Sequence, residues 1–192
     1  STSDWEDVSM FLISKSSGSD IVYGVTMEDL TFVGTEGEES TAGGNFINIR
    51  HNLGKADGSD AGSDPYPHNT SESAMFSFNR LKFIAASDYN IHTSSDLSGG
   101  AGPNQMPFHI GFGDSSDVYQ NIIISNCYFD GVGCQKGVIY FNNNNTYKNI
   151  SITNNISMRS VDTSLYTLAW DAGSVTYENF QEVNNMITDV SA

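Results

Sequence analysis

Apolar and polar residues alternate with a period of two along many short stretches of this chain. Phe108, Ile110 and Phe112 are separated by polar or small residues, and Ile122 and Ile124 follow the same rule. Such alternation predicts half-buried β-strands. No stretch combines the three-and-four apolar spacing of an amphipathic helix with capping residues, so we expect an all-β protein with minimal helix.

An eight-residue signature occurs in three places and predicts that these strands belong to a repeat. It reads Tyr-x-Asn-(Ile or Phe)-x-x-x-Asn and begins at Tyr119, Tyr147 and Tyr177. Its apolar residue stands at positions 122, 150 and 180, which gives periods of 28 and 30 residues. Periods of this length are typical of stacked repeat architectures.

A second apolar arm lies twelve residues upstream of each signature and predicts where the coils begin. The pairs with this offset are Ile13 and Val25, Ile110 and Ile122, Val138 and Ile150, and Leu168 and Phe180. Repeats that bury apolar residues only by stacking place their strands in parallel. We therefore predict a single-stranded parallel β-helix of about five coils, beginning near residues 10, 46, 108, 138 and 165.

The alternative is a sandwich or jelly roll, but hairpin-based folds give no reason for a constant offset. The last coil fits the repeat least well, because Glu182 stands where Ile124 and Ile152 stand in the earlier coils.

Three segments carry the coil pattern most clearly: YGVTMEDLTFVG, YQNIIISNCYFDG and YKNISITNNIS. They resemble the coil motif of right-handed pectate-lyase-like β-helices, which include many bacteriophage tailspikes. The resemblance covers nearly the whole chain and implies a right-handed solenoid with long loops in its first three coils. It implies a fold rather than a reaction, because the same coil occurs in lyases, hydrolases, esterases and non-catalytic adhesins.

The length of 192 residues is enough for one domain, and five coils would use all of it. The sequence shows no linker, secretion signal or apolar run long enough to span a membrane. It also shows no capping helix at either end, although a solenoid end exposes strand edges. We expect residues 1–192 to form a single β-helix domain that is a segment of a longer protein or one protomer of an assembly.

The charge balance narrows the class of partner. The chain has 8 basic and 23 acidic residues and a formal net charge of −15. Nucleic acids and anionic membranes require cationic surfaces, so both are disfavoured as partners. A neutral polysaccharide, or an anionic one bridged by a cation, fits this acidic chain better.

Cysteines and ladder residues are expected to serve the architecture. Cys127 alternates with core residues, which predicts a buried free thiol, with a bridge to Cys134 as the alternative. The recurring tyrosines and asparagines of the signature would stack from coil to coil, so we interpret them as structural ladders rather than as a sugar-binding face.

Long insertions in the first three coils are the places where function could have been added. They cover residues 34–44, 53–73 and 86–106. The first and third follow the signature arm and the second precedes it, so together they could wall a groove. In the middle insertion Asp57, Asp60 and Asp64 alternate with Gly and Ser, which suits Ca²⁺, although solvated acidic loops have the same composition.

Basic and aromatic residues near the middle insertion are the candidates for chemistry. If Ile49 and Ile110 point inward at equivalent positions, then Arg50 and His109 point outward on adjacent coils. His68 could join them, so the candidate catalytic residues are Arg50, His109 and His68. The candidate substrate-binding residues are Arg80, Lys82 and Tyr66. The alternative is that these are ordinary solvated surface residues.

These observations favour a glycan-recognising domain of a phage tailspike or tail fibre that binds a cell-surface polysaccharide, with cleavage left open. Such a protein would lie outside the cell or on the virion surface and would form a homotrimer. The alternatives are a secreted Ca²⁺-dependent polysaccharide lyase and a non-catalytic structural or adhesive solenoid. Paired carboxylates for a glycoside hydrolase cannot be assigned, because the separation between acidic residues is not legible in the sequence.

Overall fold

The computed structural model describes the strands of the chain and the residues next to them. All fifteen described elements are β-strands, and no helix occurs in this part of the chain. The described ranges are 9–13, 24–34, 44–49, 75–84, 105–111, 118–132, 138–141, 145–160, 169–171 and 174–189.

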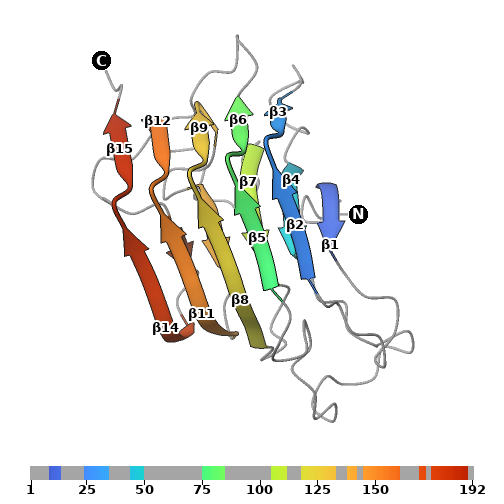
Figure 1. The fold of residues 1–192 in the computed structure, drawn as a ribbon, viewed down its shortest axis with the longest axis vertical. Helices are drawn as coiled ribbons and strands as arrows, with labels where there is room; N and C mark the ends of the chain where they lie inside the picture. Colours follow the sequence, from blue (N-terminus) through green and yellow to red (C-terminus); the bar gives the residue numbers. More distant parts are fainter. Residues whose placement is uncertain are drawn as a thin grey trace.

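The strands form three five-stranded sheets in which every pairing is parallel (Figure 1). Sheet A contains, in order, β1 (Ser9–Ile13), β4 (Gly44–Ile49), β7 (Gln105–Ile110), β10 (Ile139–Phe141) and β13 (Ala169–Asp171). Sheet B contains β2 (Gly24–Glu28), β5 (Met75–Asn79), β8 (Val118–Ser125), β11 (Thr146–Thr153) and β14 (Thr176–Val183). Sheet C contains β3 (Thr31–Val33), β6 (Lys82–Ile84), β9 (Tyr128–Asp130), β12 (Ile156–Ser160) and β15 (Met186–Asp189).

The register of sheet B follows the sequence signature. The three tyrosines of the signature are aligned on β8, β11 and β14, as are Ile122, Ile150 and Phe180. Glu182 pairs with Ile152, so the register continues unchanged into β14. The predicted equivalence of the signature arms is therefore confirmed.

The register of sheet A corrects one sequence-based prediction. Ile13, Ile49 and Ile110 are aligned as expected. The residue opposite Ile110 on β10 is Phe141 and not Val138, and the residue opposite Phe141 on β13 is Asp171 and not Leu168. The twelve-residue offset fails here because residues 142–145 connect β10 to β11, whereas residues 111–117 connect β7 to β8. The three missing residues shift the upstream arm by three positions.

Each strand of sheet B turns into sheet C through a residue in the left-handed backbone conformation. These residues have φ between 54° and 57° and are Asp29, Arg80, Asn126, Asn154 and Asn184. The first asparagine of the signature has the same conformation within its strand, at Asn121, Asn149 and Asn179. Asparagine and aspartate tolerate positive φ better than other residues with side chains, which explains why the signature keeps Asn at both places.

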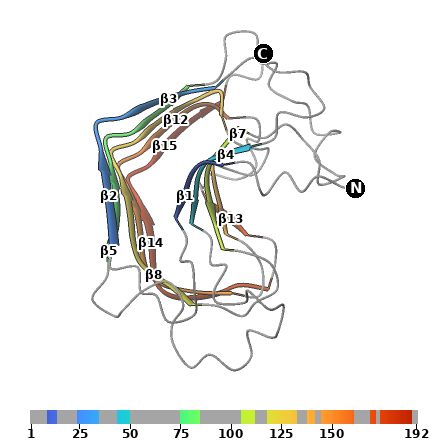
Figure 2. The ribbon, with the colours of Figure 1, turned by 90° about the vertical axis from the view of Figure 1, so that its right-hand side faces the viewer.

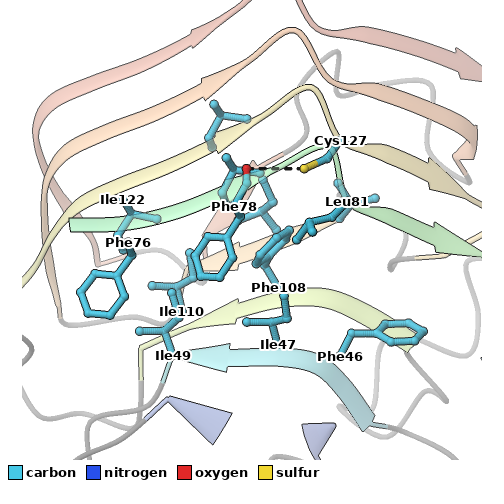
Figure 3. Packing of buried hydrophobic residues seen from close by; sticks show 14 of the residues in the cluster. Phe46, Ile47, Ile49, Phe76, Phe78, Leu81, Phe108, Ile110, Ile122 and Cys127 are labelled. Atoms are coloured by element: carbon cyan, nitrogen blue, oxygen red, sulfur yellow. Dashed lines mark hydrogen bonds between the residues drawn. The ribbon is translucent and has the colours of Figure 1, made fainter. Parts of the chain in front are cut away.

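The three sheets contribute side chains to one hydrophobic core. Figure 2 shows how the three sheets lie around it. Phe83 of sheet C stacks between Phe32 and Phe129 with ring centroids 4.8 and 5.3 Å apart. Phe108 of sheet A contacts Phe78 of sheet B edge to face, and Ile110 lies beside them (Figure 3). Three parallel sheets around a shared core are compatible with the solenoid that the repeat predicts.

Candidate functional site

The outer face of sheet A is the place where the structure gathers candidate residues for binding. Phe108 and Ile110 lie in the core, so His109 between them belongs to the opposite face of β7. In the register of sheet A, His109 is aligned with Asn48 on β4 and with Tyr140 on β10. Tyr140 is in turn aligned with Trp170 on β13. We call His109, Tyr140 and Trp170 the aromatic row.

His109 is not the solvated surface residue that its outward strand position suggested. Only 1% of its surface is exposed, and its ring lies 4.9 Å from the ring of Tyr140, centroid to centroid, at a tilt of 42°. Tyr140 itself is half-buried. His109 therefore packs against Tyr140 from the buried side, and Tyr140 is the more accessible of the two rings.

Most of the other predicted catalytic and metal-binding residues lie outside the described part of the chain. Arg50, His68 and Tyr66 fall there, as do Asp57, Asp60 and Asp64. The residue aligned with His109 on β4 is Asn48 rather than Arg50. Convergence of Arg50 and His109, and the calcium site, stay predictions. Among the described residues, no group of three or more His, Cys, Asp or Glu side chains is placed to hold a metal ion.

Arg80 lies at the turn between sheets B and C and is engaged in ion pairs. Its guanidinium donates to Asp29 at 2.7 and 2.8 Å and to Glu28 at 2.9 Å. These contacts hold the pKa of Asp29 below its usual value, mainly through the hydrogen bond from Arg80. The pairs are solvent-exposed, so they fix the turn without contributing much stability.

Lys82 belongs to yet another surface. It is exposed on β6 of sheet C, next to Phe83, which points into the core. Lys82 thus lies on a strand of sheet C, Arg80 on the turn between sheets B and C, and His109 on a strand of sheet A. It does not gather them into one constellation.

The tyrosines and asparagines of the signature form ladders, as predicted. Tyr119 and Tyr147 are fully buried and stack with ring centroids 5.4 Å apart. The Tyr147 hydroxyl donates to the Ile110 carbonyl at 2.8 Å. Asn149 donates to the Oδ1 of Asn121 at 2.9 Å, and Asn179 donates to Asn149 at 3.0 Å. Fully buried tyrosines cannot bind sugar, so the architectural interpretation is confirmed for Tyr119 and Tyr147, whereas Tyr177 at the end of the column is 36% exposed.

Cys127 is the buried free thiol that its position predicted. It lies at the inner corner between β8 and β9, with its Sγ 3.7 Å from the Phe78 carbonyl (Figure 3). Burial raises the pKa of the thiol to about 11. A protonated thiol is a poor nucleophile, so Cys127 is a packing residue rather than a catalytic one.

Long connections join the strands of sheet A to their neighbours. Residues 35–43 precede β4 and residues 85–104 precede β7, whereas residues 50–74 follow β4. By contrast, two residues join each strand of sheet B to the next strand of sheet C. The insertions therefore attach to both ends of sheet A strands, in the order that the sequence predicted.

Sequence reasoning missed Tyr140 and Trp170. A signal was present in the tripeptides FHI, IYF and AWD, each of which places an aromatic or imidazole ring at the middle position. It was obscured because the twelve-residue offset assigned the wrong register to β10 and β13. The pairing of β7 with β10 and of β10 with β13 aligns the three residues along the sheet.

The described residues contain no helix that is long and apolar enough to cross a membrane. The chain matches no known protein family, and comparisons with curated proteins and with solved structures found no match either.

Proposed function

We propose that this chain is a right-handed parallel β-helix of about five coils that binds a polysaccharide along the outer face of sheet A. The aromatic row is the observation that carries the proposal. It crosses three adjacent strands at the ladder spacing, which is about 4.8 Å between neighbouring strands. His109 is buried and supports Tyr140, so the accessible aromatic face is that of Tyr140, with Trp170 aligned beside it on β13. Aromatic faces pack against the C–H groups of sugar rings.

The connections around sheet A support a groove over this row. The segments 35–43 and 85–104 lead into β4 and β7, and the segment 50–74 leads away from β4. Long loops on a rigid scaffold are where binding residues concentrate. Arg50, His68 and Tyr66 belong to the segment that leaves β4, so this segment would bring basic and aromatic groups to the groove.

The negative net charge of the chain narrows the class of polysaccharide that it could bind. A formal charge of −15 repels polyanions, so the ligand is a neutral polysaccharide or an anionic one held through a cation. Asp57, Asp60 and Asp64 provide carboxylates of the type that bind Ca²⁺. Calcium binding by these residues is independent of the aromatic row and is tested by chelation with EDTA.

Binding rather than cleavage is the activity that we propose. A general base must reach the proton that it removes, and the His109 ring is buried against Tyr140. Catalysis would therefore require Arg50, His68 or an acidic residue of the insertions. Lyase action would release unsaturated sugars that absorb in the ultraviolet, which distinguishes the secreted-lyase alternative.

The coil motif supports a tailspike-like protein located outside the cell or on the virion surface, and tailspikes are typically homotrimers. A purely adhesive solenoid is the alternative without a dedicated glycan groove. Mutation of the aromatic row separates these possibilities, because an adhesive solenoid does not depend on it.

The test compares binding of a panel of neutral and acidic polysaccharides to the parent and to three variants. Tyr140→Ala and Trp170→Ala should each weaken binding by about tenfold or more, as truncation of an aromatic anchor does. Tyr128→Ala is the matched control, because Tyr128 is a half-buried aromatic residue on the outer face of sheet C. Equal loss in all three variants, or loss only in the control, contradicts the proposal.

A second experiment addresses the insertions and the cation. Replacing residues 53–73 with a short Gly-Ser turn should leave the fold intact, because closure entropy changes slowly with loop length. The same deletion should abolish glycan binding, and EDTA should weaken binding of the parent only if the aspartates hold Ca²⁺. A loop-deleted protein that binds as tightly as the parent contradicts the groove.

A further inference from the structure

The last described coil presents an open edge on sheets B and C. In the strand order, β14 is the last strand of sheet B and β15 is the last strand of sheet C (Figure 1). They pair in parallel with β11 and β12, and no described strand pairs with their other side. We call this open side of β14 and β15 the coil edge. The edge of a sheet is a template for pairing with further polypeptide.

Inward side chains at the coil edge are more exposed than those of the preceding coil. Tyr177 is 36% exposed, whereas Tyr147, which is aligned with it on β11, is fully buried. Phe180 is half-buried, whereas the aligned Ile150 is buried. Stacking of β14 on β11 therefore buries the inward side chains of β11, and a further coil would bury Tyr177 and Phe180 in the same way.

A ladder of side-chain amides joins each coil to the one before it at the corner between sheets B and C. The Asn155 amide accepts the Cys127 backbone N–H at 2.8 Å and donates to the Ile124 carbonyl at 3.0 Å. One coil later, the Asn185 amide accepts the Asn155 backbone N–H at 2.9 Å and donates to the Ile152 carbonyl at 3.0 Å. In both steps an asparagine side chain of one coil binds the backbone of the preceding coil.

The same corner shows what a further coil would have to provide. The backbone of Asn155 binds the following coil twice, because its N–H donates to the Asn185 side chain and its carbonyl accepts the Met186 N–H at 2.8 Å. Asn185 is the equivalent residue of the last coil, so its own N–H and carbonyl belong to the coil edge. An asparagine at the equivalent position of a further coil would accept that N–H, and the next backbone N–H would donate to that carbonyl.

The charges at the coil edge indicate the chemistry of the partner. Residues 174–189 contain three acidic residues and no lysine or arginine. At the existing interface between coils, Lys148 on β11 is aligned with Glu178 on β14, and the two side chains form an ion pair at 3.0 Å. A further strand with a basic residue at the same position would place a second cation beside Glu178. A basic segment therefore fits this edge better than an acidic one.

We propose that the coil edge binds a basic strand–turn–strand segment of a partner polypeptide, in parallel register with β14 and β15. Its turn has an asparagine equivalent to Asn185, and its first strand has a Lys or Arg opposite Glu178. Addition of an extended peptide to a sheet edge is a recurring mode of recognition. A second copy of the chain is a poor partner, because the opposite edge of the stack has Glu28 and Asp29. The coil edge is separate from the outer face of sheet A, so the proposal does not depend on the glycan site.

A synthetic peptide of residues 146–160 is the probe, because it has both strands, the asparagine and the lysine that the edge requires. Added to the 192-residue chain, it should bind with one-to-one stoichiometry in isothermal titration calorimetry. The free peptide loses backbone entropy on binding, so the affinity should lie in the high micromolar range. Hydrogen exchange should show new protection in residues 176–189 and none in residues 9–13 and 24–28, which lie at the opposite edge.

Variants of the peptide test the register without any change to the protein. Asn155→Ala in the peptide should weaken binding by about tenfold, because the Asn185 N–H would be covered without gaining an acceptor. Thr153→Ala is the matched control, since Thr153 lies between inward positions on the outward face of its strand and should not contact the edge. Lys148→Glu should weaken binding a few-fold at low salt, because it would place a carboxylate beside Glu178.

The outcomes support or overturn the proposal directly. Saturable binding that Asn155→Ala weakens and Thr153→Ala does not supports the asparagine ladder as the recognition element. Absence of binding at millimolar peptide, equal binding by these two variants, or protection only in residues 9–13 and 24–28 overturns it. Oligomers of the chain alone that grow with concentration in sedimentation velocity would assign the coil edge to a second copy and would also overturn it.

Discussion

The inner corner of the turn between sheets B and C contains a buried asparagine whose removal should be costly. Asn155 is fully buried, and its Oδ1 accepts the Cys127 backbone N–H at 2.8 Å. Its Nδ2 donates to the Ile124 carbonyl at 3.0 Å and to Asn185 at 3.1 Å. Asn155→Ala removes all of these contacts.

The magnitude follows from the groups that lose a partner. The Cys127 N–H becomes a buried donor without an acceptor, which costs about 1–3 kcal/mol, and the bond to the Ile124 carbonyl contributes about 1 kcal/mol. The Asn185 Oδ1 still accepts the Asn155 backbone N–H at 2.9 Å. We therefore expect Asn155→Ala to lower the free energy of unfolding by about 2–4 kcal/mol.

The adjacent residue provides the control. Asn154 is exposed and has φ of 57°, so Asn154→Ala should cost only about 1 kcal/mol, through strain in the left-handed conformation. Urea denaturation compares the two variants, and amide hydrogen exchange should show faster exchange of the Cys127 N–H in Asn155→Ala alone. If Asn154→Ala is equally destabilising, or if the Cys127 amide stays protected, the assigned hydrogen bonds are wrong.

Three further predictions test the core. Ile124→Asp should unfold or aggregate the protein, because it places an unpaired charge in a fully buried column, and a melting temperature equal to that of the parent would contradict the inward assignment. Tyr147→Phe should cost about 1 kcal/mol in urea denaturation by removing the bond to the Ile110 carbonyl, whereas no change would mean that this bond contributes nothing. Cys127 should resist alkylation near pH 8 until urea is added, and rapid alkylation of the native protein would disagree with a buried thiol. Because its pKa is raised in the folded state, the free energy of unfolding should fall as the pH rises from about 9 to about 11.

The sequence predicted sheet B well because its register depends on local backbone conformation. The asparagines of the signature are the residues that adopt positive φ, so their spacing marks the same two points of every repeat that has the motif. The upstream arm lacks such a marker. Its register depends on the length of the connection to sheet B, and this length differs between β7 and β10.

The side-chain environments were harder to predict than the strands. At the pair Asn154 and Asn155 the sequence cannot tell which residue points inward, because the left-handed residue interrupts the alternation of the strand. His109 was expected at the surface because the alternation of apolar and polar residues assigns it to the outer face of its strand. Alternation does not indicate whether that face is covered, and His109 is buried. The sequence therefore indicated the strand face to which His109 belongs but not its burial, and the candidate residues in the middle insertion stay predictions.

Hydrogen exchange with and without a bound polysaccharide tests whether the glycan site lies on sheet A. We expect new protection in peptides that cover residues 138–141 and 169–171 of sheet A, and none in peptides that cover residues 176–189 of sheets B and C. The polysaccharide with the tightest binding to the parent protein would serve as the ligand. Protection confined to sheets B and C, with sheet A unchanged, would contradict a glycan site on the aromatic row.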